Sequence, residues 1–161
     1  VRIREGGGTM TGLPGPETLA NIVTRVTETM FGMSFALAEL PMDQRCSRPV
    51  WRTVVLPIPG PRPLSVAIAS DEASGHTLGS AMFACAIEVV DRVMVEDSLC
   101  ELVNIVAGQV KSVMGVDDAL GLPRVLTTAD ASIDPASWRG ATMRSSCCEV
   151  LVWVAVSELG E

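Results

Sequence analysis

The stretch at residues 97–114, DSLCELVNIVAGQVKSVM, most constrains the fold because it predicts a long amphipathic helix. Its aliphatic side chains recur at about 100° per residue, the spacing of one helical face. They are Leu99, Leu102, Val103, Val106, Val110 and Val113. Polar residues and one glycine recur at spacings of three and four, which places them together on the opposite face. These are Asp97, Glu101, Asn104, Gly108 and Lys111.

The exposed face of this helix contains two residues that a helix disfavours. Asn104 is a poor residue for a helix interior, because its side chain competes for backbone hydrogen bonds. Gly108 costs about 1 kcal/mol relative to alanine in such a position. The presence of two disfavoured residues on one exposed face predicts that another molecule approaches closely there. The alternative is that Ser98 and Glu101 form a capping box at the helix start, although Asp91 offers an earlier N-cap.

Composition limits the classes of protein that the chain can represent. With 161 residues, 48% of them hydrophobic, it can bury one aliphatic core. A net charge of -7 without a basic stripe argues against nucleic-acid binding. No apolar run reaches the roughly 20 residues that span a bilayer. Residues 1–15 are glycine-rich, so we expect them to form a flexible leader, and they show no secretory signal. We expect residues 16–161 to form a single domain and the protein to be cytoplasmic.

Periodicity elsewhere predicts a mixture of helices and strands. A first helix opens at Pro16 and ends near Gly32, residues 34–40 either extend it or start a strand, and a short helix of small residues covers 77–86. Expected strands are 50–57, an alternating and half-buried strand at 64–70, a strand starting at 122–127, and one long strand or two over 141–157. Expected loops and breaks are 41–49, 57–63, 71–75, 115–121 and 130–139.

A weak internal repeat relates the first helix to the second. The apolar stripe beginning at Leu19 aligns with the one beginning at Leu99, so the two helices would be pseudo-symmetric. The exposed positions differ, since Asn21 falls on Glu101 and Thr24 on Asn104. The repeat therefore predicts two similar helices, of which only one has the Glu-Asn pair.

The cysteines and the single histidine suggest a further class, a redox or metal protein. Five cysteines are an odd number without zinc spacing, which favours reduced, structural thiols. The vicinal pair Cys147–Cys148 and His76 would have to support such a function. His76 lies in a Ser-Gly-His-Thr sequence that reads as a surface loop. No G-x-S-x-G, P-loop or H-E-x-x-H motif is present.

The sequence E101-L-V-N104-I-V-A-G108 resembles the signature helix of the CheX branch of the CheC/CheX/FliY chemotaxis phosphatases. The segment G-L-P123-R-V resembles the strand that follows this helix in the family. The resemblance implies an α+β, CheC-like fold: a mainly antiparallel sheet with two long pseudo-symmetric helices and a short helix packed on it. It also implies one active site per chain, because the first helix lacks E-x-x-N.

The resemblance further implies a function, dephosphorylation of the phosphoryl-aspartate in a CheY-like response-regulator receiver domain. Asn104 would position the attacking water, and Glu101 would pair with a lysine of the receiver. Asp97, Gly108 and Lys111 would contact the partner. The chain would need no cofactor or metal of its own, because the receiver would supply Mg²⁺.

Two further interpretations remain open from the sequence. The same fold could serve as a non-catalytic receiver-binding or dimerisation module. A homodimer could form through an exposed strand edge, for which the valine-rich C-terminal strand is a candidate. That strand could equally be central and buried.

Overall fold

The structure is a computed structural model that describes residues 12–38, 49–126, 139–145 and 149–158. Its helices are α1 (Pro16–Phe31), α3 (Glu72–Phe83), α4 (Arg92–Met114) and the short 3-10 helix η1 (Ile87–Val89). Its strands are β1 (Phe35–Leu37), β2 (Arg52–Ile58), β3 (Leu64–Ser70), β4 (Arg124–Val125), β5 (Arg139–Ser145) and β6 (Leu151–Glu158). The expected α+β class is therefore confirmed. The expected loops at 41–49 and 130–139 fall almost entirely outside the described residues, as does the Cys147–Cys148 pair.

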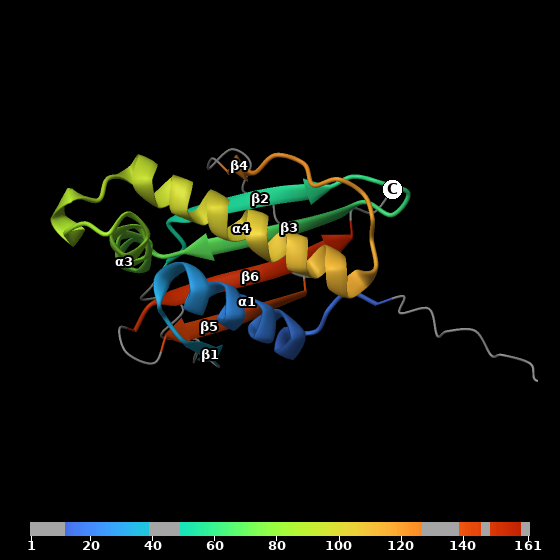
Figure 1. Cartoon of the computed structure of the whole chain (residues 1–161), viewed down its shortest axis with the longest axis horizontal. Helices are drawn as coiled ribbons and strands as arrows, with labels where there is room; N and C mark the ends of the chain where they lie inside the picture. The colour runs from blue at the N-terminus through green and yellow to red at the C-terminus, as the bar shows by residue number, and fades with distance from the viewer. Residues whose placement is uncertain (1–11, 39–48, 127–138, 146–148, 159–161) are drawn as a thin grey trace, which may run out of the picture.

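In the part of the chain that the structure describes, six strands form one sheet in the order β1-β5-β6-β3-β2-β4, and every neighbouring pair is antiparallel. Helices α1 and α4 lie side by side over one face of this sheet, and α3 packs at one end (Figure 1). The expected pair of long helices with a short third helix is thus present. The C-terminal β6 pairs with β5 and β3, so it is central and does not offer the exposed edge considered for a dimer.

The buried face of α4 is the centre of the core. Its stripe is fully buried from Val95 to Val110 and packs on β2 and β3. The last predicted member, Val113, is instead 55% exposed. Met114 packs against the core in its place. Helical phase does not explain this exposure, because Val113 lies five full turns after the buried Val95 and so has the same direction. Val113 lies in the last turn of α4, beside the C-cap Gly115.

Local sequence signals set both ends of α4. Asp91 caps α4, since its Oδ1 accepts a hydrogen bond from the backbone N–H of Met94 at 2.9 Å. Helix α4 therefore starts well before Ser98, whose hydroxyl donates to the Met94 carbonyl within the helix. The capping-box interpretation of Glu101 is wrong. At the other end, Gly115 has φ 65°, a left-handed conformation that glycine adopts without strain and that stops α4.

Helix α3 begins earlier than the sequence indicated. The break expected at 71–75 is wrong, because buried Asp71 caps the helix by accepting from the Ser74 N–H at 2.8 Å. Close packing explains the glycines inside α3: a Cβ on Gly75 would lie 2.7 Å from Val95 Cγ1 of α4. The expected close packing of this small-residue helix is confirmed, although its bounds are shifted.

His76 belongs to α3 and not to a surface loop. Its Nδ1 lies 2.8 Å from the Glu72 carbonyl oxygen, and its ring packs on Trp51 with centroids 5.4 Å apart. The Arg52 guanidinium in turn lies 4.0 Å from the Trp51 ring centroid. These contacts give His76 a packing role between α3 and the start of β2.

Strand β3 is buried more completely than a half-buried strand. Its inward residues pack under α4, and Ser65 and Ala67 on the other face are also buried. Ala67 lies between Val55 of β2 and Ala155 of β6, whose side chains help to cover it. The expected antiparallel pairing of β2 and β3 is confirmed. The run at 141–157 forms two strands, and the strand expected from residue 122 is only two residues long.

Candidate active site

The polar face of α4 points away from the sheet. Asp97, Glu101 and Asn104 are exposed, and Gly108 and Lys111 are half-buried on the following turns. This division matches the periodicity, because the opposite stripe fills the core. The helix therefore presents a carboxylate and a carboxamide one turn apart on a rigid, capped element.

Three segments of the chain converge around this pair. A cavity of about 460 Å³ is lined by Met82, Asp97, Cys100, Glu101, Asn104, Gly121, Leu122 and Pro123. One wall comes from the end of α3, the floor from α4, and the other wall from the segment before β4. The structure thus brings Asp97, Glu101 and Asn104 into one cavity, whereas Gly108 and Lys111 lie beyond its lining.

The wall made by residues 121–123 is held by backbone contacts. The Gly121 N–H donates to the Pro57 carbonyl oxygen at 2.8 Å. The approach is close, since a Cβ on Gly121 would lie 2.7 Å from Pro57 Cγ. Shortly after this contact, Arg124 pairs with Val55 in the β2–β4 ladder. The wall is therefore fixed to β2 on both sides of Leu122.

The side chains of Glu101 and Asn104 are free within the part of the chain that the structure describes. Neither forms a side-chain hydrogen bond or an ion pair with another described residue. The neighbouring Glu96 differs, because its Oε1 lies 3.1 Å from Arg52 Nε and 3.6 Å from Arg92 Nε. Glu96 is thus neutralised internally, while Glu101 and Asn104 keep their hydrogen-bonding capacity for another molecule.

Cys100 lines the cavity but is not activated as a nucleophile. Burial raises the pKa of its thiol, and the nearby charges of Asp97 and Glu96 raise the pKa further. The thiolate is the reactive form, so a raised pKa keeps Cys100 protonated at neutral pH. Cys85 is likewise a free, partly buried cysteine.

The corresponding positions on α1 do not form a second polar pair. The Thr24 hydroxyl donates to the Phe35 carbonyl oxygen of β1 at 2.8 Å, so it serves the packing of α1 on the sheet. Asn21 is exposed one turn earlier. The two helices therefore share their core pattern but differ in the use of the outer face.

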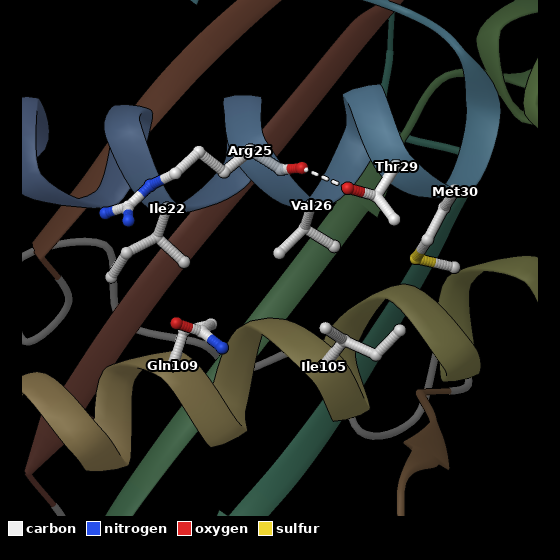
Figure 2. A pocket seen from close by; sticks show the side chains of 7 residues that line it. All are labelled: Ile22, Arg25, Val26, Thr29, Met30, Ile105 and Gln109. Atoms are coloured by element: carbon white, nitrogen blue, oxygen red, sulfur yellow. Dashed lines mark hydrogen bonds between the residues drawn. The ribbon is translucent and has the colours of Figure 1, made fainter.

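A second cavity of about 320 Å³ lies between α1 and α4 (Figure 2). It is lined by Ile22, Arg25, Val26, Thr29, Met30, Ile105 and Gln109. Ile22, Val26 and Ile105 give it an aliphatic floor, and the Gln109 carboxamide points into the space between the helices (Figure 2). This cavity is separate from the one around Asn104 and lacks a carboxylate in its lining.

Sequence reasoning did not place five of the lining residues in the site, namely Met82, Cys100, Gly121, Leu122 and Pro123. Met82 and Cys100 read as ordinary core residues of helices. Leu122 belongs to the G-L-P segment, whose similarity to the family pattern was the only signal available. Their place in the cavity depends on how α3 and the β4 segment pack around α4.

Among the described residues, no group of three His, Cys, Asp or Glu side chains is arranged to hold a metal ion. In the same part of the chain, none of the helices combines the length and apolar character required to cross a bilayer.

Comparison with known proteins identifies the family. Residues 52–145 match the family model described as chemotaxis phosphatase CheX. No curated protein matches the chain. Similar solved structures include chemotaxis protein CheX from Vibrio vulnificus, at 16% identity, TM-score 0.65 and coverage of 88% of this chain and 93% of that one. A chain of the CheX–CheY–BeF3–Mg²⁺ complex from Borrelia burgdorferi matches at 14% identity and TM-score 0.64, covering 92% of this chain and 100% of that one.

A CheC-like superfamily protein from Shewanella sp. PV-4 has the same fold, at 17% identity and TM-score 0.58, with 88% of this chain and 95% of that chain covered. The family model spans more than half of the chain and includes all of α4 with its Glu101 and Asn104. The resemblance inferred from the E-x-x-N helix is confirmed, and the chain belongs to the chemotaxis phosphatase CheX family.

Proposed function

We propose that this protein dephosphorylates a CheY-like receiver domain, with Asn104 positioning the water that attacks the phosphoryl-aspartate. The observation that carries this proposal is the exposed pair of Glu101 and Asn104, which lie one turn apart, line one cavity and have no described side-chain partner. Membership of a phosphatase family and the fold shared with a chain of a CheX–CheY complex support the same partner.

The chemistry requires little more than positioning. An acyl phosphate is reactive, so a catalyst gains most by holding water in line with the bond that breaks. The water oxygen bonds to phosphorus, and the bond from phosphorus to the aspartate oxygen breaks. The products are inorganic phosphate and the free carboxylate, and the water proton passes to phosphate or solvent. The Asn104 carboxamide can accept from the water and donate to a phosphoryl oxygen without titrating.

Glu101 would fix the docking register by pairing with a lysine of the receiver. It is exposed and carries a carboxylate that is not neutralised by a described basic residue. Charge pairs of this kind contribute mainly to orientation and to the rate of association. Mg²⁺ would belong to the receiver, and the Mg²⁺ of the CheX–CheY–BeF3–Mg²⁺ complex, a chain of which shares this fold, supports that expectation.

The test is the decay of a CheY-type receiver phosphorylated with acetyl phosphate, followed with and without this protein. Asn104→Ala should reduce the accelerated rate by roughly a hundredfold, because the water loses its positioning group. Gln109→Ala is the matched control: it removes a carboxamide from the same helix, but this side chain faces the α1–α4 cavity (Figure 2). Equal rates for Asn104→Ala and the wild type would reject the catalytic assignment.

Glu101→Gln tests docking separately from chemistry. It should raise KM for the phosphorylated receiver and weaken the dependence of KM on ionic strength, while kcat changes little. Glu17→Gln, which removes the same charge from the start of α1, should leave both constants unchanged. If the wild type binds the receiver without shortening the phosphate lifetime, the protein is a non-catalytic binding module.

A further inference from the structure

Leu122 is the most exposed large hydrophobic side chain in the described part of the chain, with 86% of its surface accessible. The other exposed large hydrophobic residues range from 43% to 64%. A single exposed leucine is ordinary on a protein surface. Leu122 differs because it lines the cavity that contains Glu101 and Asn104.

The exposure of Leu122 does not arise from a loosely held backbone. Gly121 is bonded to the Pro57 carbonyl on one side, and the β2–β4 ladder begins with Arg124 on the other. Pro123 also restricts the backbone of the residue before it to extended conformations. The leucine side chain is therefore presented to solvent by a constrained segment, which lowers the entropy lost when a partner covers it.

Another apolar side chain lines the same cavity, and two exposed apolar residues are close in sequence to residues that line it. Met82 lines the cavity at the end of α3, and Phe83 beside it is 43% exposed. Val93 lies one turn before Asp97 on the outer face of α4 and is 55% exposed. The cavity of Glu101 and Asn104 thus has the apolar side chains of Met82 and Leu122 in its lining. This arrangement of polar groups among apolar contacts is common at protein interfaces.

We propose that Leu122 is a docking anchor that inserts into an apolar depression on the receiver beside its phosphorylated aspartate. The inference rests on the proposed function, since a receiver that brings its phosphoryl group to Asn104 must enter the cavity that Leu122 lines. Leu122 contributes to binding and takes no part in the chemical step. It therefore governs KM and selects receivers that have a complementary apolar surface next to the active site.

The experiment compares steady-state constants of Leu122→Ala and wild type on a CheY-type receiver kept phosphorylated by acetyl phosphate. KM should rise roughly tenfold, as for an interface anchor, while kcat stays unchanged. Leu122→Met, which keeps the apolar surface, should restore most of the affinity. Val113→Ala is the control. Like Leu122, Val113 is an exposed aliphatic residue, but it belongs to α4 and lies about 180° around the helix from Asn104.

The melting temperature of Leu122→Ala should equal that of wild type, because the side chain is largely solvent-exposed in the free protein. An unchanged KM for Leu122→Ala, with wild type active, overturns the anchor and leaves the proposed function intact.

Binding to a receiver activated with beryllofluoride and Mg²⁺ separates the remaining cases. Leu122-dependent binding without accelerated decay supports the anchor and rejects catalysis. Absence of both binding and acceleration across a receiver panel overturns both proposals.

Discussion

Asn104 of α4 and Leu122 of the segment before β4 line the same cavity, one with a carboxamide and the other with a largely exposed aliphatic side chain. The two residues reach this cavity from different elements. Helix α4 fixes Asn104 by burying its opposite face on the sheet, and β2 fixes the segment of Leu122 through the Gly121–Pro57 hydrogen bond. A polar group and an apolar group are thus held at one site by separate parts of the core.

Gly108→Ala should separate stability from activity. A Cβ at this position meets no heavy atom within 4 Å, so alanine fits, and it should raise the unfolding free energy by about 1 kcal/mol in urea titrations. We expect the receiver to approach closely at Gly108, so the added methyl group should raise KM for the phosphorylated receiver several-fold. Gln109→Ala, at the next position in the helix, should leave KM unchanged. A more stable and fully active Gly108→Ala protein would contradict the close approach.

Asp71→Ala should destabilise the fold more than an ordinary loss of a helix cap. Asp71 is 5% exposed and accepts from both the N–H and the hydroxyl of Ser74, whose Oγ also accepts from the Leu151 N–H of β6 at 2.8 Å. We expect a loss of about 2 to 4 kcal/mol, the sum of a lost cap and an unsatisfied buried donor. Asp91→Ala removes the exposed cap of α4 and should cost only about 1 kcal/mol. Equal losses in chemical denaturation would show that the Ser74 link to β6 contributes nothing.

Cys100 should react slowly with iodoacetamide at neutral pH and faster as the pH rises. Burial and the charges of Asp97 and Glu96 raise the pKa of the Cys100 thiol, which keeps it protonated. Asp97→Asn should lower this pKa and speed alkylation, as measured by mass spectrometry of the Cys100 peptide. The folded state binds the thiol proton more tightly than the unfolded state, so this contribution to stability is present below the unfolded pKa. It is lost as pH rises through the raised folded value. Alkylation as fast as in urea-unfolded protein would contradict the shift.

Errors in the sequence-based interpretation have a common physical origin. The polar residues at 71–75 indicated a break because their local preferences favour turns, whereas burial of Asp71 and close packing of Gly75 on Val95 incorporate the segment into α3. His76 was assigned to a loop for the same reason, and its ring instead packs on Trp51. Tertiary contacts overrode the local propensity in each case.

The amino-acid pattern was enough to predict the long helix α4, its cap at Asp91, its buried stripe and the outward face with Glu101 and Asn104. These features depend on helical periodicity and on hydrogen bonds between residues close in the chain, so a short window of sequence contains them. Three features became known only from the folded chain: Met82 and Leu122 line the cavity of Asn104, β6 is central, and Val113 faces solvent. The physical reason is that these outcomes depend on strand order and on the packing of distant segments, which local periodicity does not encode.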